Sequence, residues 1–325
     1  MKEKKKKLIV TIPAFNEENS IQWVIVGVPK KIEGFRKIET VVINDGSTDK
    51  TAKIAKESGA DVVSHENKKG LGAAFQTGIN AALAKGADVI VNIDADMQFN
   101  PADIPKLTAP IVAGQADMVT ATRFKNKDDI SKNMPHIKKI GNFLFTKLVN
   151  ILTGQKFTDS QCGFRAYSKE AEIRLNLFGT FTYTQEVFFD LISKGLRIKE
   201  IPIKVKYYKH RNSHISSSLL NYGLNALVII LRTFRDWRPL LFFAIPGLAV
   251  FGTGVLFSLY FSIYWLIHHQ TTPVKTYGSV GVVCLIFGFL LIILALIADM
   301  FKRLRRNQEE IIYQLRKGNY KRFKN

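Results

Sequence analysis

Short apolar runs alternate with helix-like stretches over the first two thirds of the chain. We interpret five of these runs as buried strands: Leu8–Ile12, Val41–Ile43, Asp61–Ser64, Val89–Ile93 and Met118–Ala121. Between them lie periodic segments such as Gly70–Lys85, which is rich in alanine. Strands that alternate with helices are typical of βαβ units. The pattern therefore predicts an α/β domain with a Rossmann-like, mostly parallel sheet.

Two longer apolar segments follow, Leu240–Ile267 and Thr276–Ala298, and neither contains aspartate, glutamate, lysine or arginine. A bilayer core about 30 Å thick requires about 20 apolar residues in a helix. Because the link His268–Lys275 is short, we expect the two segments to form an antiparallel transmembrane hairpin. A buried hairpin of a soluble protein is the alternative interpretation.

Positive charge marks both outer ends of this hairpin. Arginines precede the first apolar segment, and lysines and arginines follow the second one between residues 302 and 306. By the positive-inside rule, such charge lies on the cytoplasmic side, and the two segments predict a two-helix protein of the cell membrane. The same rule predicts that both termini and the preceding α/β domain are cytoplasmic.

The chain as a whole is basic, with 47 Lys+Arg against 27 Asp+Glu and a formal net charge of +20. Nucleic acid is one ligand for so basic a chain. The basic residues gather at the two chain ends, and the C-terminal end follows the hairpin directly. We therefore expect the chain to bind an anionic lipid surface and no nucleic acid. The basic tail 301–325 is either a membrane-surface segment or a solvated one. A hydrophobic share of 46% excludes a disordered chain, and two cysteines exclude a disulfide scaffold.

Polar side chains follow four of the predicted strands directly. The carboxyl ends of parallel strands line one edge of a sheet, and ligands usually bind there. The four ends contribute carboxylates, amides and one arginine: Asn16, Glu17, Asn44, Asp45, Asp94, Asp96, Gln98 and Arg123. Their convergence on a rigid sheet predicts a functional cleft.

The run Asp94-x-Asp96-x-Gln98 places oxygen donors on one side of an extended segment. Such an oxygen-rich set suits Mg²⁺ or Mn²⁺ better than zinc. Mg²⁺ usually takes one or two protein carboxylates and completes its shell with phosphate oxygens and water. With Arg123 as a clamp for a phosphate oxygen, the cleft is expected to bind a nucleotide diphosphate together with the metal.

In this order, the segments PAFNEE, NDGSTD, KGLGAAF, DADMQ and DSQCGFR resemble the family 2 glycosyltransferases with a GT-A fold. More closely, they are similar to the polyprenyl-phosphate mannose and glucose synthases of the dolichol-phosphate mannose synthase type. The resemblance extends over about residues 8–217. One subgroup of that family also carries two C-terminal transmembrane helices. The resemblance therefore implies a GT-A catalytic domain over residues 1–212, with the hairpin within residues 239–300.

The resemblance also implies roles for single residues. The nucleotide base and ribose would contact Pro13, Phe15, Glu17, Ile43 and Asp45. The metal and diphosphate would lie on Asp94, Ala95, Asp96 and Gln98, with Asp96 and Gln98 as direct metal ligands. The phosphates of the donor and acceptor would contact Arg123 and Arg211.

On the acceptor side, the resemblance assigns the polar loop Asp159–Arg165. Within it, Gln161 and Arg165 are candidates for contacts with the sugar or the lipid phosphate. Glu186 either binds sugar hydroxyls or favours the N-terminus of a helix. We interpret Cys162 as a small packing residue.

One segment departs from the family pattern, which reads Arg-x-x-Gly-x-Ser-Lys. After Arg211, His214 replaces the glycine and Ser217 replaces the lysine. The usual lysine contact is therefore missing, and Lys209, Arg211 and His214 are the basic side chains that remain to supply its charge.

Together these features predict an inverting transfer of a hexose from GDP-mannose or UDP-glucose to a polyprenyl phosphate. The acceptor phosphate is already anionic, so no strong general base is required. A catalytically silent membrane adaptor and a processive polysaccharide synthase are the alternatives. The chain lacks the Q-x-x-R-W segment usual in processive enzymes, and its intact Asp94, Asp96, Gln98 and Arg123 argue against a silent adaptor.

Two further segments, Ile137–Leu152 and Ile215–Trp237, look amphipathic and basic. They are candidate interfacial helices, the second within residues 213–238, and packing against the catalytic domain is the competing interpretation. In the hairpin, Gly247, Gly252 and Gly254 permit close helix packing, either within one chain or between the chains of a homo-oligomer.

Overall fold

The computed structural model describes residues 5–126, 134, 136–176, 183–205, 231–232 and 234–324. The chain divides into two compact units, and its C-terminal end belongs to the first. The α/β unit comprises Met1–Ser217 and Ile312–Asn325, and the helical unit comprises Ser218–Ile311.

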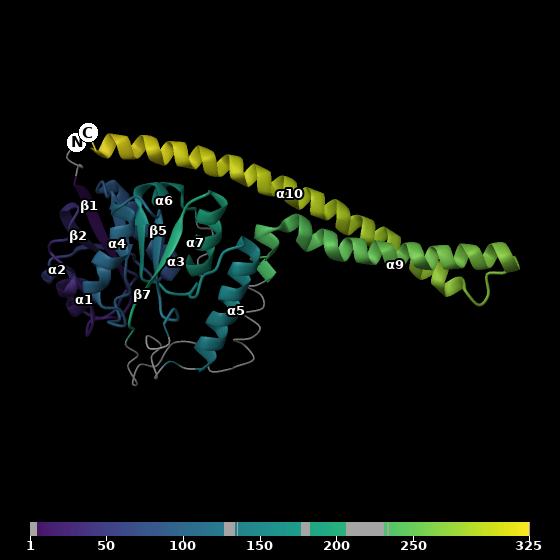
Figure 1. Ribbon diagram of the computed structural model, residues 1–325, viewed down its shortest axis with the longest axis horizontal. Helices are drawn as coiled ribbons and strands as arrows, with labels where there is room; N and C mark the ends of the chain where they lie inside the picture. The colour runs from purple at the N-terminus through teal and green to yellow at the C-terminus, as the bar shows by residue number, and fades with distance from the viewer. Residues whose placement is uncertain are drawn as a thin grey trace. The chain divides into compact units, whose positions relative to one another are not determined.

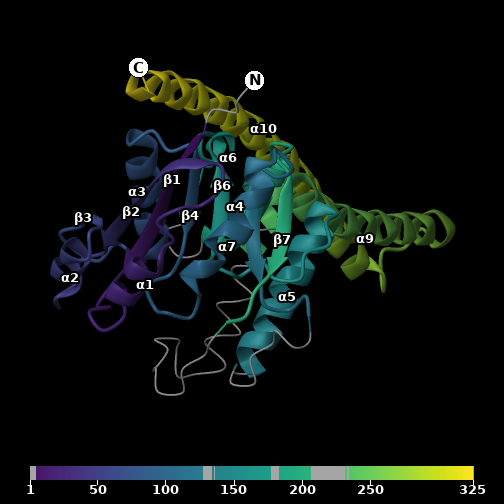
Figure 2. The same cartoon turned by 60° about the vertical axis from the view of Figure 1, so that its left-hand side comes forward.

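The α/β unit contains a seven-stranded mixed sheet in the order β3-β2-β1-β4-β6-β5-β7, with helices on both faces (Figures 1 and 2). Strand β6 pairs antiparallel with both β4 and β5, whereas the other pairs are parallel. The strands are β1 (Lys6–Ala14), β2 (Phe35–Asn44), β3 (Asp61–Ser64), β4 (Val89–Asn92), β5 (Met118–Thr122), β6 (Arg165–Ser168) and β7 (Ile198–Pro202).

Helices cover this sheet in two layers. On one face, α1, α2 and α4 share an apolar cluster with the strands, and on the other face α3 packs on β1 and β2. Helix α7 packs on α3 and α5. The helices are α1 (Ile21–Gly27), α2 (Thr51–Glu57), α3 (Leu71–Ala84), the 3₁₀ turn η1 (Pro101–Asp103), α4 (Ile104–Val112), α5 (His136–Thr153), α6 (Lys169–Arg174) and α7 (Tyr183–Ser193).

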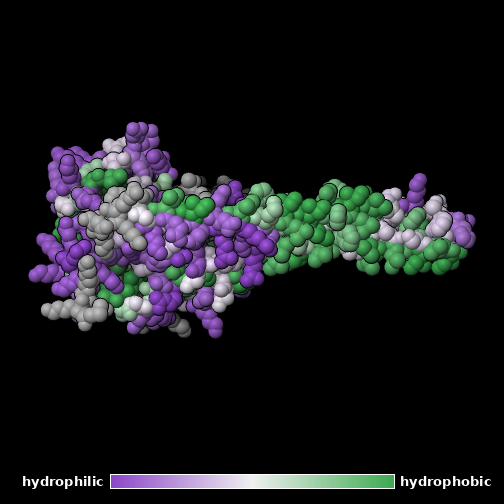
Figure 3. Space-filling view, turned by 90° about the horizontal axis from the view of Figure 1, so that it is seen from above, coloured by the Kyte–Doolittle hydropathy of each residue, from purple (hydrophilic) through white to green (hydrophobic). Residues whose placement is uncertain are grey.

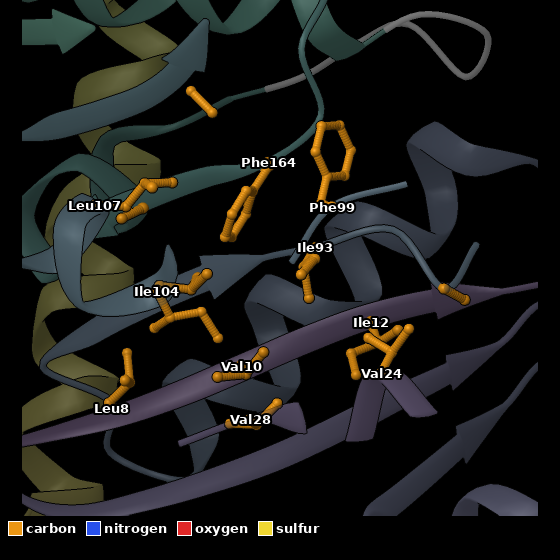
Figure 4. Packing of buried hydrophobic residues seen from close by; sticks show 14 of the residues in the cluster. Leu8, Val10, Ile12, Val24, Val28, Ile93, Phe99, Ile104, Leu107 and Phe164 are labelled. Carbon is orange, nitrogen blue, oxygen red and sulfur yellow. The ribbon is translucent and has the colours of Figure 1, made fainter. Parts of the chain in front are cut away.

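The central strand β1 shows why the apolar runs form this sheet. Its side chains alternate between the two apolar clusters: Leu8, Val10 and Ile12 pack with α1 and α4, whereas Ile9 packs with α3. Figure 4 shows the first set beside Val24 and the α4 residues. A parallel strand that is buried on both faces needs apolar residues at every position, so it reads as a continuous hydrophobic run.

Each predicted strand coincides with one of β1 to β5, except that β4 ends at Asn92, one residue before the predicted end, so this part of the prediction is confirmed. Helix α3 also agrees, because it follows Gly70, whose backbone has a φ of 94°. The sheet additionally contains β6 and β7, which the apolar pattern did not predict. The insertion of β6 between β4 and β5 makes the sheet mixed, though still mostly parallel.

The helical unit contains α9 (Pro239–His268) and most of α10 (Lys275–Lys324). Both helices are long and apolar enough to cross a membrane. Figure 3 shows apolar residues gathered over their surfaces. The two helices agree with the two predicted membrane segments.

Glycines bring α9 and α10 close together. A methyl group placed on Gly254 would come within 2.6 Å of the Leu285 amide nitrogen, and one on Gly288 would overlap the Phe251 backbone. Gly247 likewise faces α10, whereas Gly252 faces open space. The predicted close packing is therefore formed by Gly247 and Gly254 within one hairpin.

The end of α10 packs on the α/β unit. Tyr313 and Tyr320, one heptad apart, are both buried there, and Ile173 of α6 packs with them. The Tyr320 hydroxyl donates to the Ala87 carbonyl oxygen at 2.9 Å, and Arg316 Nη1 donates to the Leu175 carbonyl oxygen at 2.6 Å. These residues of the basic tail thus contact protein, in place of the membrane surface or solvent that the charge pattern predicts.

Candidate active site

Four strand ends meet at one edge of the sheet. Strands β1, β2 and β4 are parallel to one another, and β5 runs in the same direction because both β4 and β5 are antiparallel to β6. The loop that leads into β6 reaches the same edge, since β6 begins at Arg165. The sheet therefore brings together the loops in which the polar strand-end residues lie.

After β4 the chain turns sharply. Met97 has a φ of 61°, a left-handed conformation that is uncommon for a residue with a long side chain. The Gln98 amide donates to Asp96 Oδ1 at 3.0 Å across this turn. Asp94, Asp96 and Gln98 are all half-buried. An unusual backbone conformation in such a place is a marker of a functional site.

The Asp94 carboxylate lies against Gly163 of the loop before β6. A methyl group on Gly163 would come within 2.9 Å of Asp94 Oδ2, so only glycine leaves room for this carboxylate. Asn92, buried in β4, holds the loop by donating from Nδ2 to the Gly163 carbonyl oxygen at 3.2 Å. Burial, and next the Asp96 carboxylate, raise the pKa of Asp94 to about 7.

The donor set on this turn fits a hard divalent cation. Asp96 and Gln98 offer carboxylate and amide oxygens two residues apart, and Asp94 adds a second carboxylate nearby. Oxygen donors of this kind suit Mg²⁺ or Mn²⁺. The two carboxylates repel each other, and a bound cation would relieve this repulsion. No group of three or more His, Cys, Asp or Glu side chains that could hold a metal ion occurs in the described part of the chain.

Arg123, which follows β5, is held by Asp159. Its Nε donates to Asp159 Oδ2 at 2.6 Å and its Nη2 donates to Asp159 Oδ1 at 2.9 Å. Asp159 is fully buried and also accepts from the Arg123 amide. This two-pronged pair fixes the plane of the guanidinium. Arg123 also lies close enough to Asp94 to favour the charged form of that carboxylate.

Asp45, after β2, is buried in a hydrogen-bond network. Oδ1 lies 2.7 Å from His65 Nδ1 and accepts from the Lys69 amide, and Oδ2 accepts from the Gly70 amide at 2.8 Å. Burial would raise the pKa of Asp45, but these hydrogen bonds lower it below its usual value. The carboxylate thereby fixes the loop that leads into α3, at the same edge of the sheet.

Other predicted base and ribose residues have different exposures. Pro13 and Ile43 are buried within β1 and β2. Phe15 is half-buried, with Lys68 Nζ 3.8 Å from the centre of its ring. Glu17 accepts from Ser20 Oγ at 2.6 Å. Phe15 and Glu17 are therefore the accessible members of this set, while Pro13 and Ile43 lie side by side within the sheet.

The described acceptor-side residues lie on different elements of the fold. Arg165 is fully buried, donates from Nη2 to the Ser160 carbonyl oxygen and stacks on Phe188, so it has no surface for an acceptor. Gln161 is half-buried in the loop, and Glu186 lies in the first turn of α7.

Two further expectations concern Cys162 and the segment that begins at Arg211. Cys162 is fully buried, and burial raises the pKa of its thiol to about 12, which agrees with a packing role. Arg211, His214 and Ser217, together with most of the predicted interfacial helix 213–238, lie outside the described residues.

Three residues that organise the site were not singled out from the sequence. Asp159 positions Arg123, Asn92 positions Gly163, and His65 supports Asp45. Each contacts a partner at least 20 residues away in the chain. The position of Asp159 within the DSQCGFR segment is the only local signal for any of them.

The family model described as Glycosyl transferase family 2 matches residues 9–175. The UDP-N-acetylglucosamine–dolichyl-phosphate N-acetylglucosaminyltransferase of Methanococcus voltae is 30% identical over 250 residues, which cover 70% of this chain and 96% of the relative. A dodecaprenyl-phosphate galacturonate synthase of Rhizobium johnstonii is 24% identical over 305 residues, covering 91% and 88%.

Among solved structures, glucosyl-3-phosphoglycerate synthase from Mycobacterium tuberculosis is similar to this chain. In its complex with Mn²⁺, uridine diphosphate and glucosyl-3-phosphoglycerate, it superposes with a TM-score of 0.53 at 25% sequence identity. The match covers 70% of this chain and 79% of the synthase.

Proposed function

We propose, because the chain belongs to glycosyl transferase family 2, that it moves a hexose from a nucleotide-diphosphate sugar to a polyprenyl phosphate. Its α/β unit has the GT-A fold, and the two relatives described above are named for dolichyl- and dodecaprenyl-phosphate chemistry. The observation that carries the proposal is the convergence of Asp94, Asp96, Gln98 and Arg123 at one sheet edge, in a chain with two candidate membrane spans.

The donor sugar is the open part of the proposal. The two relatives are named for different sugars, N-acetylglucosamine and galacturonate. GDP-mannose and UDP-glucose follow from the motif resemblance, and UDP-N-acetylglucosamine follows from the Methanococcus voltae relative. All three donors therefore belong in the first assay.

The site chemistry suits departure of a nucleoside diphosphate. When bound, a divalent cation supplies positive charge that stabilises the leaving diphosphate. Asp96 and Gln98 would hold that cation, and the Mn²⁺ of the solved relative supports a metal of this class. Arg123, fixed in orientation by Asp159, adds a second positive charge for a phosphate group.

The acceptor needs positioning more than activation. A polyprenyl monophosphate carries an anionic oxygen at neutral pH, so it can attack the anomeric carbon without a strong base. Direct attack inverts the anomeric configuration, which gives a β-linked product from an α-linked donor. Holding the two reactants in place contributes roughly 7–11 kcal/mol to lowering the barrier. Asp94, beside Gly163, is the carboxylate we assign to orienting the sugar.

Helix α5 supports access to a membrane lipid. One side of it packs in the α/β unit, while Ile140, Phe143, Leu144 and Ile151 are exposed on the other. An exposed apolar stripe with Lys147 within it is the pattern of a helix that lies on a bilayer surface. We assign this face of α5 to the cytoplasmic surface of the membrane. Phe143→Ser is then expected to weaken transfer to acceptor in liposomes more than transfer to a water-soluble short-chain acceptor, and an equal loss with both would contradict this assignment.

A transfer assay tests the proposed function. Membranes that contain the chain receive polyprenyl phosphate, Mn²⁺ or Mg²⁺, and each labelled donor separately. We expect label in the organic-extractable lipid with one donor, and less than about 1% of that rate for Asp96→Ala. The control is Asp103→Ala, which removes a carboxylate that pairs with Lys106 and takes no part in the assigned site, and it is expected to leave the rate unchanged.

The assay also separates the alternatives. Label that passes into long polymer would indicate a processive synthase. Purified protein that binds no nucleotide and transfers no label would indicate a silent adaptor. Full activity of Asp96→Ala would refute the assigned metal site.

A further inference from the structure

Glu200 on strand β7 holds the turn that precedes β6. It lies beside Thr120 in the parallel β5–β7 pair. Its Oε1 accepts from the amides of Thr158 and Asp159 at 2.9 and 3.0 Å, and its Oε2 accepts from Thr158 Oγ1 at 3.1 Å. One carboxylate thus binds two consecutive backbone amides and a hydroxyl, which leaves the turn little freedom.

The turn Thr158–Asp159 contains Asp159, the residue that binds the guanidinium of Arg123. Asp159 uses both carboxylate oxygens, with Oδ2 at 2.6 Å from Arg123 Nε and Oδ1 at 2.9 Å from Arg123 Nη2. A second link runs from the turn to β5, where the hydroxyls of Thr158 and Thr122 are 2.7 Å apart. Continuous hydrogen bonds therefore connect Glu200 to Arg123 through Thr158 and Asp159.

This arrangement is electrostatically expensive for a purely structural link. Burial raises the pKa of Glu200, and the nearby negative charge of Asp159 adds to this, against the hydrogen bonds from the turn. The acidic side chains of Glu200 and Asp159 are thus held close together, and Asp159 pairs with Arg123. An amide or a hydroxyl could accept the same backbone hydrogen bonds without that repulsion. The residue that gains a defined orientation from it is Arg123, at the edge of the site.

We propose that Glu200 is a positioning residue for the transfer reaction, which acts by fixing the Thr158–Asp159 turn so that Asp159 presents Arg123 to a phosphate group. The inference rests on the proposed function, because Arg123 is assigned there to the phosphate. It makes the effect of Glu200 on the reaction dependent on Arg123, because without the guanidinium the turn has no phosphate-binding group to orient.

A double-mutant cycle tests this dependence in the full-length protein. Glu200→Ala is expected to lower kcat/KM by about 10- to 100-fold, since small misplacements of a binding group cost this much. In an Arg123→Ala background, the same change is expected to cost less than about 3-fold. Equal fold-losses in both backgrounds would overturn the proposal.

Two further variants exclude a general loss of structure. Glu200→Gln retains an acceptor oxygen for the turn and is expected to recover at least a third of the wild-type rate. Lys199→Ala changes the neighbouring residue on β7, whose amine donates to Gln115 on the surface, and is expected to behave as wild type. A Lys199→Ala loss equal to that of Glu200→Ala would also overturn the proposal.

The same cycle is read a second time by thermal unfolding of the full chain in detergent, without donor or metal. If the double variant loses less melting temperature than the sum of the losses in Glu200→Ala and Arg123→Ala, the proposed connection is supported. Additive losses overturn it. Failure of the wild-type chain to transfer label from any donor counts against the proposed function, while the unfolding cycle still tests the connection between Glu200 and Arg123.

Discussion

The contact of Tyr320 with the α/β unit allows a sharp test of how the end of α10 contributes to stability. The Tyr320 ring is 2% exposed, and its hydroxyl donates to the Ala87 carbonyl oxygen at 2.9 Å, with Asp88 Oδ1 also within 3.2 Å. Lys169 Nζ lies 3.5 Å from the ring centre. Tyr320→Phe keeps the ring and its packing and removes only the hydroxyl. The change therefore isolates the buried hydroxyl, whose shortest hydrogen bond is the one to the Ala87 carbonyl oxygen.

The expected magnitude follows from that hydrogen bond. A neutral intramolecular hydrogen bond contributes about 1 kcal/mol, and a buried acceptor left without a donor costs about 1–3 kcal/mol. We expect Tyr320→Phe to reduce the local stability of the segment around Ala87 by roughly 1–3 kcal/mol. Because each 1.4 kcal/mol is a factor of about ten, local opening becomes about 5- to 150-fold more frequent. Tyr320→Ala removes the ring as well and should cost about 3–5 kcal/mol, as for other buried aromatic residues.

Hydrogen–deuterium exchange of the full-length protein in detergent measures this effect. The informative amides are those of Ala87 and Asp88, which donate to the Ala82 and Lys7 carbonyl oxygens. The control is Tyr260→Phe, which changes an exposed tyrosine of α9. Unchanged exchange of the Ala87 and Asp88 amides in Tyr320→Phe, or the same increase in the control, would refute the reasoning.

Three further changes probe other parts of the molecule. Gly163→Ala should displace the Asp94 carboxylate and lower the transfer rate at least about 100-fold with little change in melting temperature; a wild-type rate would contradict the close contact. Burial raises the pKa of Glu172 well above its usual value, so the folded state retains a proton that the unfolded state releases above about pH 4.5, and stability falls as the pH rises. Glu172→Gln should remove this dependence of the unfolding free energy on pH, measured by urea unfolding between pH 4 and 8. An equal pH dependence in the variant and the wild type would contradict the raised pKa of Glu172. Gly288→Leu should separate α9 from α10 and abolish an engineered disulfide crosslink between them, whereas Gly252→Leu, facing open space, should preserve it.

The first five strands could be predicted because the sheet buries them strongly. In β1, residues on both faces are buried, so consecutive positions must be apolar and the strand is visible in the sequence as an apolar run. Strand β6 is different, since it is short and includes Arg165, a charged residue that is fully buried. Its position depends on pairing with β4 and β5, and no local pattern carries that information. Strand β7, with Lys199 and Glu200, was missed for the same reason.

The candidate site could be predicted to the extent that single strand ends carry it. Asp94, Asp96 and Gln98 follow one strand, so their proximity is local. The pairing of Arg123 with Asp159 spans 36 residues, and only the folded chain shows it. Arg165 illustrates the converse: an arginine in a polar loop motif looked available to a ligand, but it is buried against Phe188. Burial of a charged side chain is rare enough that sequence reasoning does not anticipate it.

The contact made by the end of α10 has a consequence for the order of biosynthesis. Strand β7 ends at Pro202, whereas Tyr320 is translated only after both apolar helices. At roughly 5–20 residues per second, the ribosome needs on the order of 10 s to cover that interval. All seven strands are therefore translated before the Tyr320 hydroxyl is available to the backbone carbonyls of Gly86 and Ala87. Docking of the last turns can begin only after both apolar helices have been made, so a nascent chain that stops short of Tyr320 leaves this patch uncovered and open to proteases and chaperones.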